Sequence, residues 1–313
     1  MFQHKVQATI LFLSYNQEDF VAESAKSCLA QLGEPLDIIF SDDCSTDKTY
    51  AILQDLVRTY AGPHQVRIRQ NSRNLGIADH YNILVKLARC DLLITAAGDD
   101  ISYPNRAQTL FNAWMSSGYK LDLIASYAQS FTHDGQDTNQ EVQVDQLARW
   151  RGPADWCRKR PYVVGATHAF TKRIWTEFGD IASDIPYEDQ IVTLRALCLG
   201  GGLTVQKKLL NYRAGGVSSK GSLHEPNERF AALERRYSRQ RAVFAQVRND
   251  LEQAGHSILW NGKVKKYWTR AQAALQLLQW HKENHHPSLR ELVQMTWQCG
   301  IFWTPRQVFY TWK

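Results

Sequence analysis

The first 130 residues alternate between two hydrophobic periodicities, and this alternation restricts the possible folds more than any other feature. Short apolar runs rich in β-branched residues predict strands over 6–13, 36–40, 66–69, 91–96 and 121–127. Between them, apolar residues at helical spacing predict helices over 18–32, 47–60, 77–88 and 104–115. Strands that alternate with helices form a mostly parallel sheet covered on both faces, so we expect a Rossmann-like α/β fold.

The rest of the chain is less regular and then becomes helical. The polar stretch 132–145 is expected to be a loop. Strands are expected over 163–171 and 203–212, and helices over 172–178 and 188–199. After a Gly/Ser-rich stretch at 215–221, helical spacing continues over 227–255, 263–283 and 288–299. We therefore expect an α/β domain over 1–224 and a helical C-terminal extension over 225–313.

The formal net charge of +6 is distributed unevenly between these two regions. Residues 1–224 carry 23 basic and 24 acidic side chains, whereas residues 225–313 carry 14 basic and 7 acidic side chains, together with six of the ten Trp. Such a tail can simply pack on the α/β domain, bind an anionic membrane surface or bind nucleic acid. Nucleic acid is not expected as a partner, because a nucleic-acid enzyme usually spreads its basic residues along the working cleft.

Three whole-chain features predict the compartment. The six cysteines include no C-x-x-C pair, which is typical of thiols in a reducing compartment. The N-terminal apolar run lacks a small-residue cleavage site and is interpreted as a strand, not as a signal peptide. No window approaches eighteen apolar residues, so no transmembrane helix is expected. A cytoplasmic protein is predicted, with peripheral attachment to the inner face of the membrane left open.

Polar side chains follow the predicted strands at the edge where an open parallel sheet binds ligands. Asp42 and Asp43 follow the second strand, and Asp99 and Asp100 follow the fourth. Because like charges repel, two such pairs at one edge are best stabilised by a cation, and carboxylate oxygens suit Mg²⁺ or Mn²⁺ shared with a phosphate. The sequence contains neither a P-loop nor a G-x-G-x-x-G turn, so phosphates would be held by the metal. A carboxylate after the second strand can accept the N3–H of uracil or thymine, and Tyr15 can stack on the ring.

Five short motifs occur in a characteristic order. They are S-Y-N-Q at 14–17, D-D-C-S-T-D-K-T at 42–49, N-L-G at 74–76, G-D-D at 98–100 and E-D-Q at 188–190. In this order the series resembles the signature of the family 2 glycosyltransferases with the A-type (GT-A) fold, over about residues 6–215. The resemblance implies inverting transfer of a sugar from a nucleotide-diphosphate sugar with a divalent metal, Mg²⁺ or Mn²⁺.

The resemblance also implies roles for individual residues. Tyr15 and Asp43 match the positions that hold the nucleotide base, with Asp42 beside them. Asp100 matches the direct metal ligand, and Asp99 a contact to the ribose or the metal. The chain departs from the commoner pattern at Gly98, where many relatives have the first Asp of the motif.

The acceptor side of the site is assigned in the same way. Asp189, preceded by Glu188, matches the catalytic base at the start of a helix, where the helix dipole favours a carboxylate. Arg213 matches a basic position near the diphosphate. Gly215 stands where many relatives have a His. Simpler interpretations are a helix N-terminal acid pair for Glu188 and Asp189 and a surface position for Arg213.

The expected activity is transfer from a UDP- or dTDP-sugar to a glycan or lipid-linked glycan acceptor in the synthesis of a bacterial surface polysaccharide, such as lipopolysaccharide O-antigen. Two alternatives from other classes stay open: a non-catalytic nucleotide-sugar-binding protein, and a basic nucleic-acid-binding protein that acts through its C-terminal helices. His168 is interpreted as a packed histidine of the core or rim. Trp156 and Trp175 are interpreted as core residues.

Overall fold

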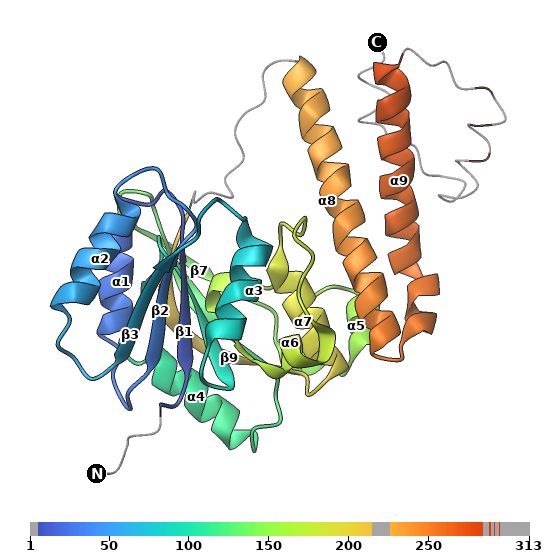
Figure 1. Cartoon of the computed structure of the whole chain (residues 1–313). Helices are drawn as coiled ribbons and strands as arrows, with labels where there is room; N and C mark the ends of the chain where they lie inside the picture. Colours follow the sequence, from blue (N-terminus) through green and yellow to red (C-terminus); the bar gives the residue numbers. More distant parts are fainter. Residues whose placement is uncertain (1–5, 215–225, 284–287, 289–290, 292–293, 295–313) are drawn as a thin grey trace. The chain divides into compact units, whose positions relative to one another are not determined.

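The computed structural model describes residues 6–214 and 226–283, together with positions 288, 291 and 294 (Figure 1). The chain divides into two compact units, one of residues 1–183 and 187–219 and the other of residues 184–186 and 220–313. The first unit is a mixed α/β structure and the second is helical. The stretch 215–221 and nearly all of the helix expected over 288–299 lie outside the described residues.

The first half of the α/β unit has the expected strand–helix alternation. Four strands pair in parallel in the order β3-β2-β1-β4, with bounds β1 Thr9–Ser14, β2 Asp37–Asp42, β3 Gln65–Gln70 and β4 Leu92–Ala97. Their connections are helices α1 Val21–Leu29, α2 Thr49–Thr59 and α3 Ile77–Leu87. Both central strands are buried along their whole length, which explains their continuous apolar sequence. The Rossmann-like expectation is thus confirmed for this half.

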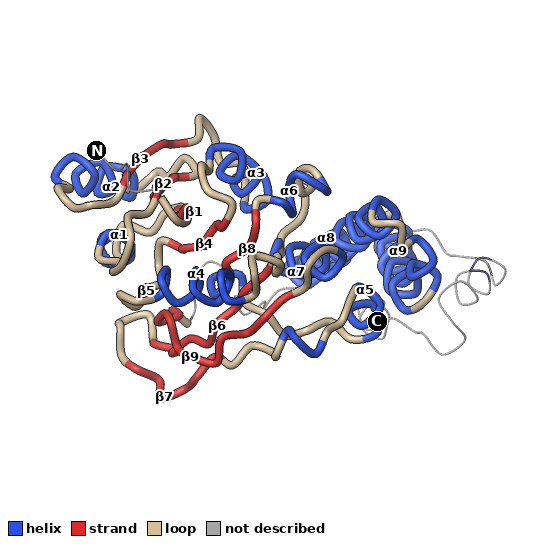
Figure 2. The backbone as a smooth tube through the Cα atoms, turned by 90° about the horizontal axis from the view of Figure 1, so that it is seen from below, coloured by secondary structure: helices blue, strands red, loops and turns tan. Residues whose placement is uncertain are grey.

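The second half of the sheet contains reversed strands. A three-residue strand, β8 Ala169–Thr171, pairs antiparallel with β4 and with β6 Leu123–Phe131. Next to β6 lies β9 Gly202–Arg213, which runs parallel to it and pairs antiparallel with the short β5 Ile101–Ser102. The full order is β3-β2-β1-β4-β8-β6-β9-β5, as Figure 2 shows in the view along the strands. The helices of this half are α4 Arg106–Ser116, α5 Pro153–Arg158, α6 Arg173–Phe178 and α7 Glu188–Cys198, with short 3-10 turns at Leu147–Arg149 and Gly165–Thr167.

Two expectations for the middle of the chain are wrong. The stretch 132–145 contains a strand, β7 Asp137–Val142, which pairs antiparallel with β6. Its side chains are largely exposed, so it lacks the apolar face by which strands are predicted. The stretch 163–171 forms a strand only over its last three residues, because the N–H groups of Thr167 and His168 bond back to Val164 and Gly165 in a turn.

Both faces of the sheet are covered by apolar side chains. Helices α1, α2 and α4 contribute Val21, Leu53 and Leu110 to one core cluster with the inner side chains of β1, β2 and β4. Helices α3 and α6 lie on the opposite face (Figure 2). Their Tyr81 and Trp175 rings stack with centroids 6.4 Å apart. Trp175 and Trp156 are 6% and 1% exposed, as expected of core residues.

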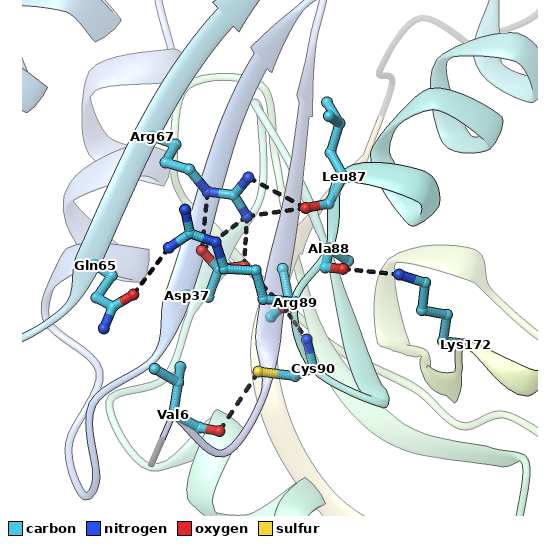
Figure 3. A network of polar contacts seen from close by, with 10 residues as sticks. Val6, Asp37, Gln65, Arg67, Leu87, Ala88, Arg89, Cys90 and Lys172 are labelled. Atoms are coloured by element: carbon cyan, nitrogen blue, oxygen red, sulfur yellow. Dashed lines mark hydrogen bonds and ion pairs between the residues drawn. The ribbon is translucent and has the colours of Figure 1, made fainter. Parts of the chain in front are cut away.

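A polar network fixes the amino-terminal edge of the sheet (Figure 3). The fully buried carboxylate of Asp37 accepts bonds from Nε and Nη2 of Arg67, and the same guanidinium donates to the carbonyl of Leu87 at 3.1 Å. At this edge Arg89 donates to Oε1 of Gln65 at 3.1 Å. The network therefore ties the C-terminal end of α3 to β2 and β3, at the edge opposite the carboxyl ends of the strands.

The helical unit is a hairpin of two long helices, α8 Pro226–Gln253 and α9 Lys263–Lys282, joined through a 3-10 turn at Ser257–Asn261 (Figure 1). Leu277 and Leu278 form a buried cluster with Phe230, Leu233, Tyr237 and Trp280, and Lys282 pairs with Glu234 at 2.8 Å. None of the described helices is both long and apolar enough to cross a bilayer.

Candidate active site

The loops after β1 and β2 are bonded to each other at the carboxyl edge of the sheet. Asn16 adopts a positive φ of 49°, and its Oδ1 accepts the N–H of Thr46 at 2.9 Å while its own N–H donates to Oγ of Ser45 at 2.8 Å. The N–H of Gln17 donates to Oγ1 of Thr49 at 2.7 Å, at the start of α2. Tyr15 is half-buried in this paired loop, at the position expected to face a nucleotide base.

Asp42 lies at the end of β2 and has no exposed surface. Its carboxylate accepts the N–H of Ser45 at 2.8 Å, Nε2 of Gln70 at 3.0 Å and the hydroxyls of Ser14 and Ser45. These bonds hold the β2–α2 loop against β1 and β3. The structure therefore places Asp42 under the loop that carries Asp43, with no surface for direct contact with a ligand.

Asp43 is 4% exposed and is oriented by the loop before α3. Its Oδ1 accepts Nδ2 of Asn71 at 2.6 Å and the N–H of Leu75 at 2.9 Å, and its Oδ2 accepts the N–H of Gly76 at 2.9 Å. An ionised carboxylate has about four acceptor positions, so these three bonds leave one, on Oδ2. The N-L-G motif at 74–76 thus supplies backbone donors that fix this carboxylate.

Asp99 and Asp100 form the turn that follows β4. Burial raises the pKa of Asp100 to about 8, with a further contribution from the neighbouring Asp99, and burial also raises the pKa of Asp99. Oδ1 of Asp100 accepts the backbone N–H of Arg213 at 2.9 Å. The turn therefore concentrates two poorly solvated carboxylates, whose ionised forms a cation would stabilise.

Arg213 is 5% exposed and not at the surface, so the simpler interpretation of this residue is wrong. Its guanidinium lies between the rings of Phe20 and Phe131, each 4.2 Å from Cζ. Its Nε donates to the carbonyl of Asp99 at 3.0 Å, and Nη1 donates to the carbonyl of His133. The side chain thus holds the end of β9 against the Asp99–Asp100 turn and supplies a positive charge beside it.

Glu188 and Asp189 begin α7. Burial raises the pKa of Glu188 to about 8, with a contribution from Asp189, and burial raises the pKa of Asp189 to about 6. The N–H of Gln190 and the charge of Arg160 oppose the shift at Asp189. Burial thus favours the protonated forms of both groups, and the higher pKa of Glu188 makes it the more readily protonated member of the pair. A β-carbon at Gly165 would lie 2.7 Å from Oε1 of Glu188, so the glycine allows the 165–167 turn to approach the pair closely.

Tyr212 connects the two acid pairs electrostatically, and sequence reasoning missed it. Burial raises its pKa, and the charges of Asp100, Asp99 and Asp189 all raise it further. A group that interacts with both pairs lies within electrostatic reach of each, because such interactions weaken with distance. The available signal was its place beside Arg213 at the end of a predicted strand.

Gln17 is a second residue that sequence reasoning did not assign to the site. Its carboxamide accepts the N–H of Tyr15 at 3.2 Å and hydrogen-bonds to Asp99, which lowers the pKa of that carboxyl group. A β-carbon at position 98 would lie 2.3 Å from Oε1 of Gln17 and 3.0 Å from Cβ of Ser14. The space beside Gly98 is thus occupied by the Gln17 side chain.

His168 is 2% exposed, and burial, with Arg106 nearby, lowers its pKa to about 3. It is a packed neutral histidine, as expected.

Together these residues place two poorly solvated acid pairs within electrostatic reach of Tyr212 in a mixed α/β unit. Among the described residues there is no group of three or more His, Cys, Asp or Glu side chains that could hold a metal alone. The two carboxylates of the turn after β4 fit a hard cation only if the remaining ligands come from a diphosphate and water.

The chain belongs to glycosyl transferase family 2, whose model matches residues 9–170. It is 24% identical over 172 residues to the dTDP-rhamnosyl transferase RfbG of Shigella flexneri, covering 53% of this chain and 55% of that protein. It is 28% identical over 113 residues to the succinoglycan biosynthesis protein ExoO of Rhizobium meliloti, covering 36% and 31%. The chain spans between 26% and 55% of the length of the curated relatives it matches.

Solved structures share the fold at low sequence identity. TarS of S. aureus, solved with UDP, superposes with a TM-score of 0.55 at 12% identity, covering 94% of this chain and 88% of that chain. The mannosyltransferase PcManGT of Pyrobaculum calidifontis, solved with GDP-Man and Mn²⁺, gives 0.55 at 15% identity, covering 99% and 84%. The fold of this chain is therefore the GT-A glycosyltransferase fold.

Proposed function

We propose that this protein is an inverting glycosyltransferase that moves a sugar from a UDP- or dTDP-sugar to a hydroxyl group of a glycan or lipid-linked glycan. The observation that supports the proposal is that two poorly solvated acid pairs lie within electrostatic reach of Tyr212: Asp99 and Asp100, in a turn suited to a metal-bound diphosphate, and Glu188 and Asp189, at a helix start suited to a general base. A single displacement needs these two functions and no covalent intermediate.

Asp43 would recognise the nucleobase of the donor by a hydrogen bond. Its one remaining acceptor position matches the single N3–H of uracil or thymine, whereas guanine presents two donors on the same edge. Tyr15 would stack on the ring. Asp42, which is fully buried, would act indirectly by shaping the loop.

Asp100 would be the direct ligand of Mg²⁺ or Mn²⁺, with Asp99 contacting the ribose or the same ion. The bound metal would neutralise the charge that develops on the leaving diphosphate. Arg213 would add a fixed positive charge behind this turn, and its hydrogen bonds to backbone carbonyls would keep the turn in place.

Asp189 would act as the general base. With a pKa of about 6 it is ionised at neutral pH and can accept the proton of the acceptor hydroxyl as that oxygen attacks the anomeric carbon. Glu188, protonated at neutral pH, would adjoin the base without competing for the proton. Attack from the side opposite the diphosphate inverts the anomeric configuration.

Two relatives support a role in polysaccharide synthesis, since RfbG is named for dTDP-rhamnosyl transfer and ExoO for succinoglycan biosynthesis. The expected product is a bacterial surface polysaccharide. The proposal is tested by screening UDP- and dTDP-sugars for metal-dependent thermal stabilisation and then for transfer. Stabilisation without turnover would favour the non-catalytic nucleotide-sugar-binding alternative, and salt-sensitive binding of DNA in a gel shift would favour the nucleic-acid-binding alternative.

For the helical unit we propose peripheral binding to an anionic membrane on the cytoplasmic side. The turn between α8 and α9 presents Ile258, 79% exposed, and the start of α9 presents Tyr267, 46% exposed, with the exposed Lys265 and Lys266 beside it in the sequence. Apolar tips flanked by lysines suit an anionic lipid surface. Ile258→Asp should reduce sedimentation with phosphatidylglycerol vesicles, and Leu32→Asp, at an exposed aliphatic side chain of the other unit (63%), should not.

A further inference from the structure

A dense group of positive charges lies within the nearly neutral α/β unit. Residues 149–160 contain five basic side chains and one acidic side chain, Asp155, a net charge of +4. The basic members, here called the basic strip, are all exposed: Arg149, Arg151, Arg158, Lys159 and Arg160. The net charge of the whole α/β unit is close to zero, so this local excess of positive charge is not evident from the composition.

The basic strip adjoins the predicted catalytic base. Helix α5, which carries Arg158, packs against α7, which begins with the acid pair. The residue after the base, Gln190, donates from Nε2 to the carbonyl of Pro161 at 3.1 Å, directly beyond the strip. Arg160 also lowers the pKa of Asp189 through its charge.

The backbone and anchoring contacts of the strip are well defined. Asp155 accepts the N–H of Arg151 and Nη1 of Arg158, both at 3.0 Å. The carbonyl of Lys159 accepts Nε1 of Trp150 at 2.7 Å, and the Arg160 guanidinium lies 5.9 Å from the ring of the buried Trp156. The strip therefore carries a net positive charge at a defined place on the surface, next to the acid pair at the start of α7.

The position of the basic strip indicates that it contacts the acceptor and not the donor. The proposed place of the donor diphosphate is the Asp99–Asp100 turn. The acceptor hydroxyl must contact Asp189 to lose its proton, so the acceptor extends from there across the surface beside α5. We propose that the basic strip binds phosphate groups of the acceptor, an inference that rests on the proposed role of Asp189.

The acceptor phosphate can belong to a lipid diphosphate carrier or to a phosphate within a glycan chain. Three probes separate these sources: N-acetylglucosaminyl diphosphate with a phenoxyundecyl tail, soluble N-acetylglucosamine 1-phosphate, and the neutral phenoxyundecyl N-acetylglucosaminide. Binding is measured with the full chain in EDTA and without a nucleotide, so that a metal at the donor site does not contribute.

The test variant is Arg151→Gln/Arg158→Gln/Lys159→Gln, which leaves Arg160 and its effect on Asp189 intact. The control is Lys26→Gln/Arg58→Gln/Arg89→Gln. Arg58 pairs with Asp55 at 3.0 Å and i,i+3 spacing with a 76% exposed side chain, and Arg158 pairs with Asp155 at the same distance and spacing with a 74% exposed side chain. Arg58 and Arg89 lie near the amino-terminal edge of the sheet, away from the site (Figure 3 labels Arg89).

An exposed ion pair contributes a factor of about two to five in affinity, so losing three should weaken binding of the diphosphate probe by about tenfold or more. Raised salt should reproduce this loss in the wild type. The affinity of the test variant for the neutral probe should change by less than about twofold. The control variant should bind all three probes as tightly as the wild type does. Soluble phosphate bound as tightly as the tailed diphosphate would identify glycan phosphate as the source, and tighter binding of the tailed diphosphate would identify the carrier.

Unchanged binding of both phosphate probes in the test variant would overturn the proposal. So would an equal loss for the neutral probe, which would indicate a purely structural role. If the variant instead lost binding only to phosphatidylglycerol vesicles, the strip would be a lipid surface and not an acceptor site. Metal-dependent UDP binding, measured in parallel, tests the donor site separately, so that failure of the proposed function is distinguished from failure of this inference.

Discussion

The backbone N–H of Arg213 donates a 2.9 Å hydrogen bond to Oδ1 of Asp100, across 113 residues of sequence. This bond joins the last residue of β9 to the turn after β4, and the neighbouring guanidinium bonds to the carbonyl of Asp99. The proposed metal carboxylate is thus oriented by the same residue that, together with Arg106, provides a buried positive charge near it. Its geometry depends on the packing of a strand that lies far from it in the sequence.

Arg213→Lys should weaken metal binding while leaving the fold intact. The ammonium cannot reproduce the planar stack between Phe20 and Phe131 or the bond from Nε to Asp99. We expect the Mn²⁺ concentration that half-saturates UDP binding to rise by about tenfold, corresponding to the loss of about 1–2 kcal/mol. Lys208→Gln on the same strand is the control, and an equal effect there would contradict the assignment.

Asp189→Asn should abolish transfer and preserve donor binding. Removing a general base costs about 10²- to 10⁴-fold in kcat, and the amide keeps the size of the side chain. Glu188→Gln is the matched control, because it mimics the protonated state assigned to Glu188 and should retain most of the activity. Steady-state kinetics with a radiolabelled donor measures both, and full activity of Asp189→Asn would disprove the role of base.

The pH profile should report the raised pKa of Asp189. The base acts in its ionised form, so kcat should rise with pH up to about 6 and become level above it. An ordinary aspartate would give a level profile down to about pH 4. Measurement at saturating metal and donor keeps the Asp100 ligand ionised throughout, and a profile level from pH 4.5 to 7 would argue against this carboxylate as the base.

Asp100→Asn should stabilise the metal-free protein while removing activity. Burial raises the folded-state pKa of Asp100 to about 8, so its favourable contribution to stability is present below pH 4 and is lost as the pH rises towards 8. Asn avoids this loss and can still accept the N–H of Arg213. At pH 8 in EDTA we expect the variant to be more stable by about 1–3 kcal/mol by urea unfolding, with no difference at pH 4; lower stability at pH 8 would contradict the argument.

Gly98→Ala should displace the Gln17 side chain and so weaken donor binding. The new methyl would lie 2.3 Å from Oε1 of Gln17, and moving the carboxamide breaks its bonds to Asp99 and to the N–H of Tyr15. Each lost bond costs about 1 kcal/mol, so the KM for the donor should rise by about tenfold. Gln17→Ala alone should have a similar effect, and the double variant should be no worse than either single one. Additive effects would show that the two positions act independently.

Much of the first half of the α/β unit could be predicted from sequence because its signals are local. Continuous apolar runs define β1 and β2, and polar residues at their ends define Asp43 and Asp100 as candidates. The roles of single carboxylates were less accessible, since Asp42 and Asp43 differ only in which loop donors surround them. That difference depends on Asn71 and Gln70, which a third strand brings alongside.

The second half was harder because its elements depend on distant partners. The antiparallel β7 has a polar sequence and is stabilised by pairing with β6, and only three residues of the apolar stretch 163–171 form a strand. Tyr212 and Gln17 belong to the site because β9 and the β1–α1 loop converge on the Asp99 turn. The hydrophobic periodicity of a sequence predicts helices and strands, but it does not predict which loops and strand ends meet in space.

The strand β8 joins the two halves of the sheet, with β3-β2-β1-β4 on one side and β6-β9-β5 on the other. The family match ends at residue 170, within this three-residue strand. The matched range thus contains β1–β4 together with β5, β6 and β7, and it ends before Glu188, Asp189 and β9. The proposed general base therefore lies in the part of the chain that the family model does not match, so we expect this protein to differ from other members of its family mainly in the acceptor that it uses.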